Sequence, residues 1–295
     1  MSGGPDSLAL LWLAAAARPG SVEAATVDHD LREGSGEEAS MVAAACARLG
    51  VPHAILQPAW ASPPVTAIEE RSREARYAAL AAWMAARSLA ALATGHHRDD
   101  QAETLVMRLN RGAGVRGLAA MRPVARVPGC DALLVRPLLS WAREELAGIC
   151  DAAGLRPALD PSNADFRFER ARVRNALAAS DWLDPDALAR SATYLAAADE
   201  ALDWAADAEW DAHVAQAGEE LRYRPVTAPP EIRRRVVSRA VAQLGSEGAG
   251  EPLRGREVDR LLAILETGQV ATLRGVRCRG GGEWRFAPAP PRRAH

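Results

Sequence analysis

The feature that constrains this chain most is a glycine turn at its beginning, followed at once by an apolar run. Gly3 and Gly4 stand between Ser2 and the segment Pro5-Asp6-Ser7, and Leu8 to Ala17 is rich in leucine and alanine. Glycine allows the backbone to take left-handed angles and to approach a ligand closely, while Asp6 or Ser7 is expected to cap the helix that follows. Because a helix start carries free N–H groups and a partial positive charge, the turn predicts a phosphate-binding site.

The turn differs from the commoner phosphate-binding loops. The loop with the pattern G-x-x-x-x-G-K-[ST] is excluded, because the sequence contains no lysine. The segment Ser2 to Ser7 instead resembles the S-G-G-x-D-S loop of the N-type ATP pyrophosphatases. These enzymes cleave ATP to AMP and pyrophosphate while they adenylate a substrate.

The order of apolar runs predicts an α/β fold. Runs typical of buried strands alternate with stretches that have helical spacing; the strands are expected at 23–27, 51–56, 90–94 and 133–135, and the helices at 37–49, 66–89 and 141–153. Alternation of this kind predicts a parallel sheet with helices on both faces and with ligands at the carboxyl ends of the strands. Together with the loop at Ser2 to Ser7, this arrangement resembles the adenine nucleotide alpha hydrolases. A phosphate loop of this type usually follows a buried strand, and since the chain begins on the loop, the sheet is expected to lack its central strand.

The composition changes near residue 180, which predicts a catalytic domain over 1–180 and a smaller, mainly helical domain over 181–295. Residues 181–220 contain eleven acidic residues and one arginine, whereas residues 270–295 contain six arginines and one acidic residue. A basic end of this kind can bind phosphates, although the net charge of the whole chain is close to zero. Short strand-like pieces are expected between Val270 and Phe286. Trp182, Trp204 and Trp210 are expected to anchor its core.

Global properties exclude several classes of protein. No apolar run is long enough to span a bilayer and no signal peptide precedes the turn, so no membrane association and a cytoplasmic location are predicted. The four cysteines contain no C-x-x-C pair, which argues against a metal site or a disulfide framework.

A second candidate site follows the predicted strand at 90–94. The segment from His96 to Thr104 contains Asp100 and Glu103, which share a face if a helix begins near Asp99. Two carboxylates across a crevice from the Gly3-Gly4 turn can hold Mg²⁺ or the ammonium group of a cationic substrate. The plainer alternatives are an ordinary capped helix start and histidines with a purely structural role.

Further arginines are placed to bind phosphates. Arg111 precedes Gly112 and Gly114, so it is interpreted either as a loop cation directed at ATP or RNA, or as a turn residue. The alternating positions Arg170, Arg172 and Arg174 are dense enough to bind an RNA backbone, and the alternative is a solvated basic face.

Together these segments identify the chain as similar to the tRNA(Ile)-lysidine synthetase family within the PP-loop superfamily. The segments that carry the resemblance are Ser2 to Ser7, Val27 to Arg32, Arg73 to Tyr77, Gly95 to Thr104, Leu109 to Met121, Asp160 to Asp165 and Arg170 to Arg174. The match is dense over residues 2–178 and loose in the C-terminal third. It departs from the family pattern at Ala171, where the family usually has asparagine.

The resemblance implies an ATP-dependent ligation of L-lysine to the wobble cytidine of the CAU anticodon of tRNA(Ile). ATP would adenylate the C2 oxygen of the base with release of pyrophosphate, and lysine would then displace AMP. The resemblance implies that ATP binds to Ser2, Gly3, Gly4, Pro5, Asp6, Ser7, Val27, Asp28, His29 and Arg111. Asp6 would hold Mg²⁺, and Asp6, Asp100 and Glu103 would be the catalytic residues.

The same resemblance implies how the other two substrates bind. Asp100 and Glu103 would bind the ammonium groups of lysine, and Arg76 its carboxylate. Arg170, Arg172 and Arg174 would contact the tRNA. Members of the family are often dimeric, so the resemblance is compatible with a homodimer.

Three other functions compete with this interpretation. A thiolating tRNA enzyme of the same superfamily would need cysteines near the site. A metal-dependent phosphohydrolase would use Asp28, His29, His96, His97 and Asp100 as metal ligands. A tRNA-binding module without catalytic activity is the third. ATP–pyrophosphate exchange that depends on tRNA separates all three from the ligase.

Overall fold

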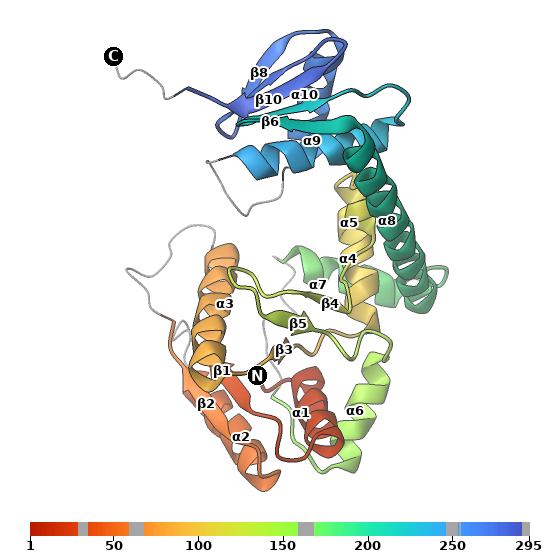
Figure 1. Cartoon of the computed structure of the whole chain (residues 1–295). Coiled ribbons are helices and arrows are strands. Elements are labelled where there is room, and N and C mark those ends of the chain that lie inside the picture. The colour runs from red at the N-terminus through yellow and green to blue at the C-terminus, as the bar shows by residue number, and fades with distance from the viewer. Residues whose placement is uncertain (29–34, 59–67, 159–167, 246–252, 254, 291–295) are drawn as a thin grey trace. The chain divides into compact units, whose positions relative to one another are not determined.

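The computed structural model describes the chain apart from residues 29–34, 59–67, 159–167, 246–252, 254 and 291–295 (Figure 1). The chain divides into two compact units, Met1–Tyr194 and Leu195–His295. The division falls within the long helix α8 (Pro185–His213), C-terminal to the domain boundary predicted at residue 180. Among the described residues, no helix has the length and apolar character needed to cross a membrane.

The first unit contains the predicted parallel strands. β1 (Ala24–Val27) pairs in parallel with β2 (His53–Leu56), and β3 (Ala91–Ala93) pairs in parallel with β5 (Leu133–Val135). An additional strand, β4 (Val124–Arg126), runs antiparallel to β5. The described strands of this unit form two sheets, β1-β2 and β3-β5-β4. The α/β class predicted from the sequence is thus confirmed.

Helices cover both faces of these strands. The helices are α1 (Pro5–Ala17), α2 (Ser35–Arg48), α3 (Ile68–Arg87), α4 (Arg98–Asn110), α5 (Val115–Leu118), α6 (Arg143–Ala152) and α7 (Glu169–Ala179). Successive residues of a strand point to opposite faces. Accordingly, Ala24 belongs to the core formed with α1, α2 and α6, whereas Ala25 belongs to the core formed with α3.

Helix α1 is fixed by this first core. Leu8, Leu10 and Leu11 are all buried, and they pack in one cluster with residues of α2 and α6. Burial of each leucine contributes about 2 kcal/mol. The glycine turn that begins α1 is therefore held on a rigid element.

The second unit is built on a five-stranded antiparallel sheet in the order β6-β7-β10-β9-β8. Its strands are β6 (Val214–Ala217), β7 (Glu220–Tyr223), β8 (Val270–Leu273), β9 (Val276–Arg279) and β10 (Trp284–Pro288). The helices α9 (Pro230–Leu244) and α10 (Gly255–Glu266) supply apolar side chains to the same core as the sheet. Tyr223 and Trp284 meet edge to face in this core, with ring centroids 5.7 Å apart.

The expectation of a mainly helical second domain missed the hairpin of β6 and β7. Gly218 takes a positive φ of 64° in its turn, and Leu221 and Tyr223 are buried on one face. Two of the three expected tryptophan anchors are also wrong, because Trp182 and Trp204 are 80% and 75% exposed. Only Trp210 of that group is buried. The high alanine content of this region favoured the prediction of helices, so neither the hairpin nor the exposure of these tryptophans was predicted.

Candidate active site

The glycine turn forms an uncapped helix start. Gly3 has a positive φ of 76°, and a Cβ atom there would lie 3.0 Å from the Met41 side chain. Gly4 is the N-cap residue of α1 and no side chain caps the helix, so the expectation that Asp6 or Ser7 would do so is wrong. The Ser7 hydroxyl instead donates to the Gly4 carbonyl oxygen at 3.0 Å. The first-turn N–H groups of α1 thus have no side-chain acceptor, which suits a phosphate.

The turn between β3 and α4 packs directly against this helix start. A Cβ atom on Gly95 would lie 2.9 Å from the backbone oxygen of Asp6 and 3.3 Å from the nitrogen of Ser7. Only glycine fits at that distance without displacing the backbone. Because Gly95 has no side chain, two segments that are far apart in the sequence can pack against each other.

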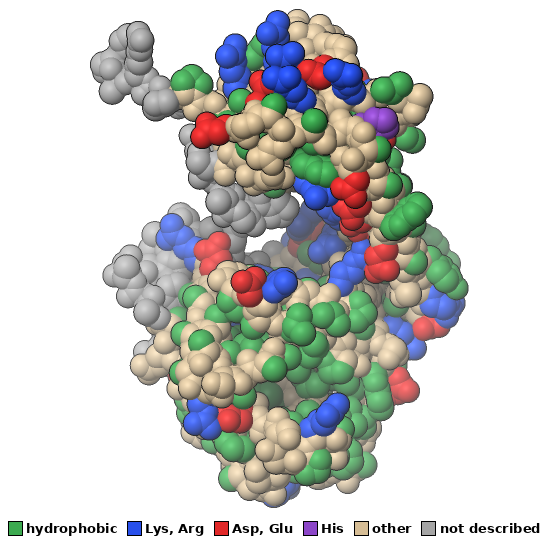
Figure 2. Space-filling model, viewed as in Figure 1, with side chains coloured by type: hydrophobic (Ala, Val, Ile, Leu, Met, Phe, Trp, Pro, Cys, Tyr) green, Lys and Arg blue, Asp and Glu red, His purple; other side chains and the backbone are tan. Residues whose placement is uncertain are grey.

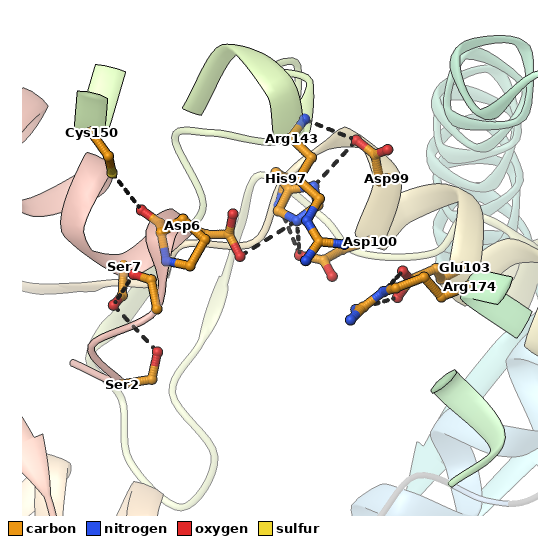
Figure 3. Close-up of polar contacts among 12 residues, drawn as sticks. Ser2, Asp6, Ser7, His97, Asp99, Asp100, Glu103, Arg143, Cys150 and Arg174 are labelled. Carbon is orange, nitrogen blue, oxygen red and sulfur yellow. Dashed lines mark hydrogen bonds and ion pairs between the residues drawn. The ribbon is translucent and has the colours of Figure 1, made fainter. Parts of the chain in front are cut away.

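His97 connects the two segments. Its Nε2 atom lies 3.6 Å from a carboxylate oxygen of Asp6 and 3.6 Å from one of Asp100, and its Nδ1 atom lies 3.4 Å from Asp99 (Figure 3). His97 is 3% exposed. Burial lowers the pKa of His97, but the carboxylates of Asp99, Asp100 and Asp6 outweigh that effect, so the pKa is raised overall.

Asp6 has an unsatisfied oxygen in this cluster. Its Oδ1 atom is buried and has no hydrogen-bond partner among the described residues. Burial raises the pKa of Asp6, the charge of Asp100 adds to this rise, and His97 opposes it. A nearby cation would stabilise the charged form of such a buried carboxylate.

The start of α4 is shaped by its own acidic residues. Asp100 accepts a hydrogen bond from the backbone N–H of His97 at 3.0 Å, which satisfies a free donor of the first turn. Asp99 accepts one from the backbone N–H of Arg143 at 3.2 Å. These bonds fix the direction in which both carboxylates point.

The pKa of His96, the neighbour of His97, is shifted in the opposite direction. Burial lowers its pKa to about 4, with Arg136 and Arg170 contributing and Asp100 opposing. Its Nδ1 atom lies 2.9 Å from the hydroxyl of Thr94. His96 is therefore neutral at pH 7, beside a histidine whose pKa is raised.

The two acidic residues of α4 are paired with arginines of α7. Glu103 is 2% exposed, and its carboxylate accepts hydrogen bonds from Arg174 at 2.6 and 3.2 Å and from Arg170 at 2.7 Å. Arg170 also donates to Asp100 at 3.1 Å. Hydrogen bonding to Glu103 raises the pKa of Arg174. The acidic pair is thus neutralised by the chain itself.

The three arginines expected to bind tRNA do not share one face. They lie on the helix α7, where residues four apart are neighbours, so Arg170 and Arg174 both face α4. Arg172 is exposed and lies elsewhere on the helix surface. Arg111, expected to contact phosphate, forms an ion pair with Glu169 of α7.

The remaining predicted site residues are placed as follows. Val27 ends β1, and Asp28 follows it with its backbone N–H bonded to Leu56 at 2.9 Å. His29 lies outside the described residues, as does the segment 160–165. Arg76 is exposed on α3. Ser2 is exposed and its hydroxyl donates to that of Ser7 at 3.3 Å.

The sequence did not reveal the connecting role of His97 or the pairing of Arg170 and Arg174 with Asp100 and Glu103. The i, i+4 spacing of the two arginines was a usable signal, because it matches the one-turn spacing of the acids. The hypothesis of a two-metal phosphohydrolase requires a cluster of metal ligands. Among the described residues, which exclude His29, no group of three or more potential ligands is found.

Comparison with known proteins identifies the domain family. A family model described as the PP-loop domain matches residues 1–180. The fold and the glycine turn thus define a PP-loop protein. The solved U34-tRNA thiolase NcsA from Methanococcus maripaludis, with its [4Fe-4S] cluster, matches with a TM-score of 0.53 and 18% identity over 68% of this chain and 70% of that one. At this identity the likeness concerns the fold alone.

Curated relatives define the family more closely. The tRNA(Ile)-lysidine synthase of Novosphingobium aromaticivorans is 46% identical over 100% of this chain and 89% of its own length. That of Zymomonas mobilis is 41% identical over 99% of this chain and 88% of its own. The chain belongs to the tRNA(Ile)-lysidine synthase family. Membership makes it an ATP-binding, tRNA-modifying ligase.

Proposed function

We propose that this chain ligates lysine to C2 of the wobble cytidine in the CAU anticodon of tRNA(Ile), through an adenylated tRNA. The observation that carries the proposal is the meeting of Asp6 and Asp100 at one nitrogen of His97, 3.6 Å from each. A two-step reaction on one base needs a nucleotide site and an amine site next to each other. The phosphate turn and the acidic start of α4 have that relationship.

In the first step, the C2 oxygen of the cytidine attacks the α-phosphorus of ATP. A new P–O bond forms as the bond to the β-phosphate breaks, and pyrophosphate leaves. The first-turn N–H groups of α1 bind the phosphates, with the hydroxyls of Ser2 and Ser7 beside them. Val27, Asp28 and His29 contact the adenosine, and Arg111 exchanges Glu169 for a phosphate.

Asp6 is the residue that fits Mg²⁺. Its buried Oδ1 atom has no hydrogen-bond partner within the described part of the chain, and Mg²⁺ is commonly held by one or two carboxylates together with substrate phosphates. Bound there, the ion would neutralise charge on the leaving pyrophosphate. His97 holds the Asp6 carboxylate in position.

In the second step, an amino group of lysine attacks C2. The C–N bond forms, the bond from C2 to the oxygen breaks so that AMP leaves with that oxygen, and the proton lost by the amine passes to water. Asp100 and Glu103 bind the ammonium group, and Arg76 binds the carboxylate.

Lysine can bind the two carboxylates only if the arginines that pair with them move away or share them with lysine. Arg170 is 39% and Arg174 25% exposed at the side chain, so both can rotate toward solvent. We propose that they exchange the acids for RNA phosphates as tRNA binds. This exchange reconciles the observed ion pairs with a role in tRNA binding.

We propose a cytoplasmic location, because tRNA, ATP and lysine are the proposed substrates. A homodimer is proposed only because members of the family are often dimeric. It is tested by the molar mass in solution, measured by light scattering.

The test is to incubate the protein with ATP, Mg²⁺, labelled lysine and a tRNA(Ile) transcript that carries the CAU anticodon. Label is expected in the RNA, and none when ATP is omitted or when the wobble cytidine is replaced by uridine. Asp6→Asn is expected to abolish pyrophosphate release. Asp100→Asn is expected to allow pyrophosphate release but to weaken transfer of lysine. Absence of label in the RNA with the folded wild-type protein would contradict the proposal.

A further inference from the structure

Asp99 lies where the starts of two helices meet. It belongs to the first turn of α4, and its Oδ2 atom accepts a hydrogen bond from the backbone N–H of Arg143, the first residue of α6, at 3.2 Å. The same oxygen lies 3.4 Å from Nδ1 of His97 (Figure 3). One carboxylate oxygen therefore contacts both a helix start and the buried ring that separates Asp6 from Asp100.

The ring of His97 has different neighbours on its two sides. Nε2 lies 3.6 Å from Asp6 and 3.6 Å from Asp100. Nδ1 is buried and forms no regular hydrogen bond with a described residue, so the Asp99 oxygen is the acidic group that compensates it. The partner of one ring nitrogen sets the orientation of the imidazole, and hence what the other nitrogen faces. Asp99 is thus placed to decide where Nε2 points.

The three carboxylates around this ring are a local feature of the site. On the face of the first unit that Figure 2 shows, acidic and basic side chains are scattered among apolar ones. Asp6, Asp99 and Asp100 instead surround one buried imidazole. Because like charges repel, each carboxylate keeps its place only if other contacts hold it. Asp100 is held by the backbone N–H of His97, and Asp99 by that of Arg143.

Helix α6 anchors both sides of this arrangement. Its buried side chains pack in one core with those of α1. The thiol of Cys150 donates to the carbonyl oxygen of Pro5, next to Asp6, at 3.3 Å. In the first turn of the same helix, the backbone N–H of Arg143 donates to Asp99. One helix therefore fixes the start of α1 and also the carboxylate on the far side of the ring.

We propose that Asp99 is a positioning residue for the reaction on ATP: it holds the ring of His97 in the orientation that keeps Nε2 between Asp6 and Asp100. The inference rests on the proposed function for the identity of the reaction. Asp99 needs no contact with ATP or lysine for this role. The competing explanation is that Asp99 only satisfies a free N–H group at the start of α6 and so stabilises that helix.

Three variants of the full chain separate these two roles. Asp99→Ala removes both contacts, and because the side chain is 26% exposed, it leaves no closed cavity. Asp99→Asn keeps an amide oxygen, which the N–H of Arg143 directs to the place of Oδ2 and hence toward the ring. Glu145→Ala is the matched control, because Glu145 accepts from the backbone N–H of Ala142 at 2.6 Å at the same helix start. Within the described chain, the acidic neighbours of the His97 ring are the three aspartates.

The measurements are kcat and KM for ATP in tRNA-dependent pyrophosphate release, with the urea midpoint of each variant. Asp99→Ala is expected to lower kcat on the order of tenfold with little change in KM, because the ring and the two carboxylates beyond it lose their fixed geometry. Asp99→Asn is expected to keep most of the wild-type kcat. Glu145→Ala is expected to lower the urea midpoint about as much as Asp99→Ala does, but to keep the wild-type kcat.

A double-mutant cycle shows whether Asp99 acts through the ring. If it does, Asp99→Ala combined with His97→Asn turns over no more slowly than His97→Asn alone. A wild-type kcat in Asp99→Ala would overturn the inference. So would an Asp99→Asn variant as slow as Asp99→Ala, or single effects that multiply in the double variant.

The placement of the ring is also measured without any reaction, which keeps the inference separable from the proposed function. NMR signals of the imidazole nitrogens of His97 are expected to shift in Asp99→Ala and to stay in place in Glu145→Ala. If lysine transfer fails while this shift is seen, the placement of the ring by Asp99 stands and the reaction is wrong. If lysine transfer succeeds while neither the ring signals nor kcat respond to Asp99→Ala, the reaction stands and the role of Asp99 is wrong.

Discussion

Asp6 and Asp100 come from helices far apart in the sequence, yet each places a carboxylate oxygen 3.6 Å from the same nitrogen of His97. One carboxylate belongs to the phosphate turn and the other to the acidic start of α4. Their spacing is set by the buried ring between them. The geometry of the candidate site thus depends on a side chain that needs no contact with substrate.

Replacing His97 by asparagine is expected to lower the rate of pyrophosphate release on the order of 100-fold, because the two carboxylates lose their common partner and small displacements of reacting groups are costly. Asparagine is a good N-cap residue, so α4 should still begin at the same place. The measurement is kcat and KM for ATP in tRNA-dependent pyrophosphate release, with the melting temperature as the control for folding. A reduced melting temperature with unchanged kcat would show that His97 is merely structural.

Gly95→Ala is expected to destabilise the protein by about 2 kcal/mol, because the new Cβ would lie 2.9 Å from the backbone oxygen of Asp6 and force the turn away from α1. Gly148→Ala is the matched control. Gly148 lies inside α6 with nothing within 4 Å of a Cβ, so alanine should stabilise there by roughly 0.5 to 1 kcal/mol. Urea unfolding measures both, and a neutral Gly95→Ala would refute the tight packing of the turn.

These residues show what the sequence could and could not predict. The strands, the glycine turn and the position of Asp100 and Glu103 on one helix followed from local patterns of short range. The contact between Gly95 and Asp6 did not, because it depends on how two βα units pack. Nor did the partners of Glu103, since Arg170 reads equally well as an RNA contact or an ion-pair partner until α7 is placed beside α4.

The prediction for the second unit was wrong for a different reason. Its hairpin of β6 and β7 consists of short strands with small residues such as Ala215 and Ala217, which have no strong strand preference. Of the two, β7 pairs with β10, and that strand begins at Trp284, far along the chain. Local preference was overruled by a contact of long range.

Glu103→Gln is expected to destabilise the protein by about 2 kcal/mol, because the buried carboxylate loses its charge, which leaves Arg174 without its carboxylate partner and Arg170 with Asp100 alone. The partial exposure of the arginines keeps the loss below that of a fully buried pair. Glu169→Gln is the control, since its partner Arg111 is 62% exposed, and its loss should stay under about 1 kcal/mol. Equal shifts of the urea midpoint in the two variants would contradict the buried network.

The stability of the protein is expected to fall with acid through His96. Burial lowers its folded-state pKa from 6.5 to about 4, so between those pH values the unfolded chain binds a proton that the folded chain does not. The free energy of unfolding contributed by His96 is therefore present above pH 6.5 and is lost as the pH falls toward 4, with a slope of at most about 1.4 kcal/mol per pH unit. His96→Gln removes this dependence, whereas His213→Gln, at an exposed position, should not. Urea unfolding from pH 4 to pH 8 measures the difference, and parallel curves for the wild type and His96→Gln would show that folding does not lower the pKa of His96.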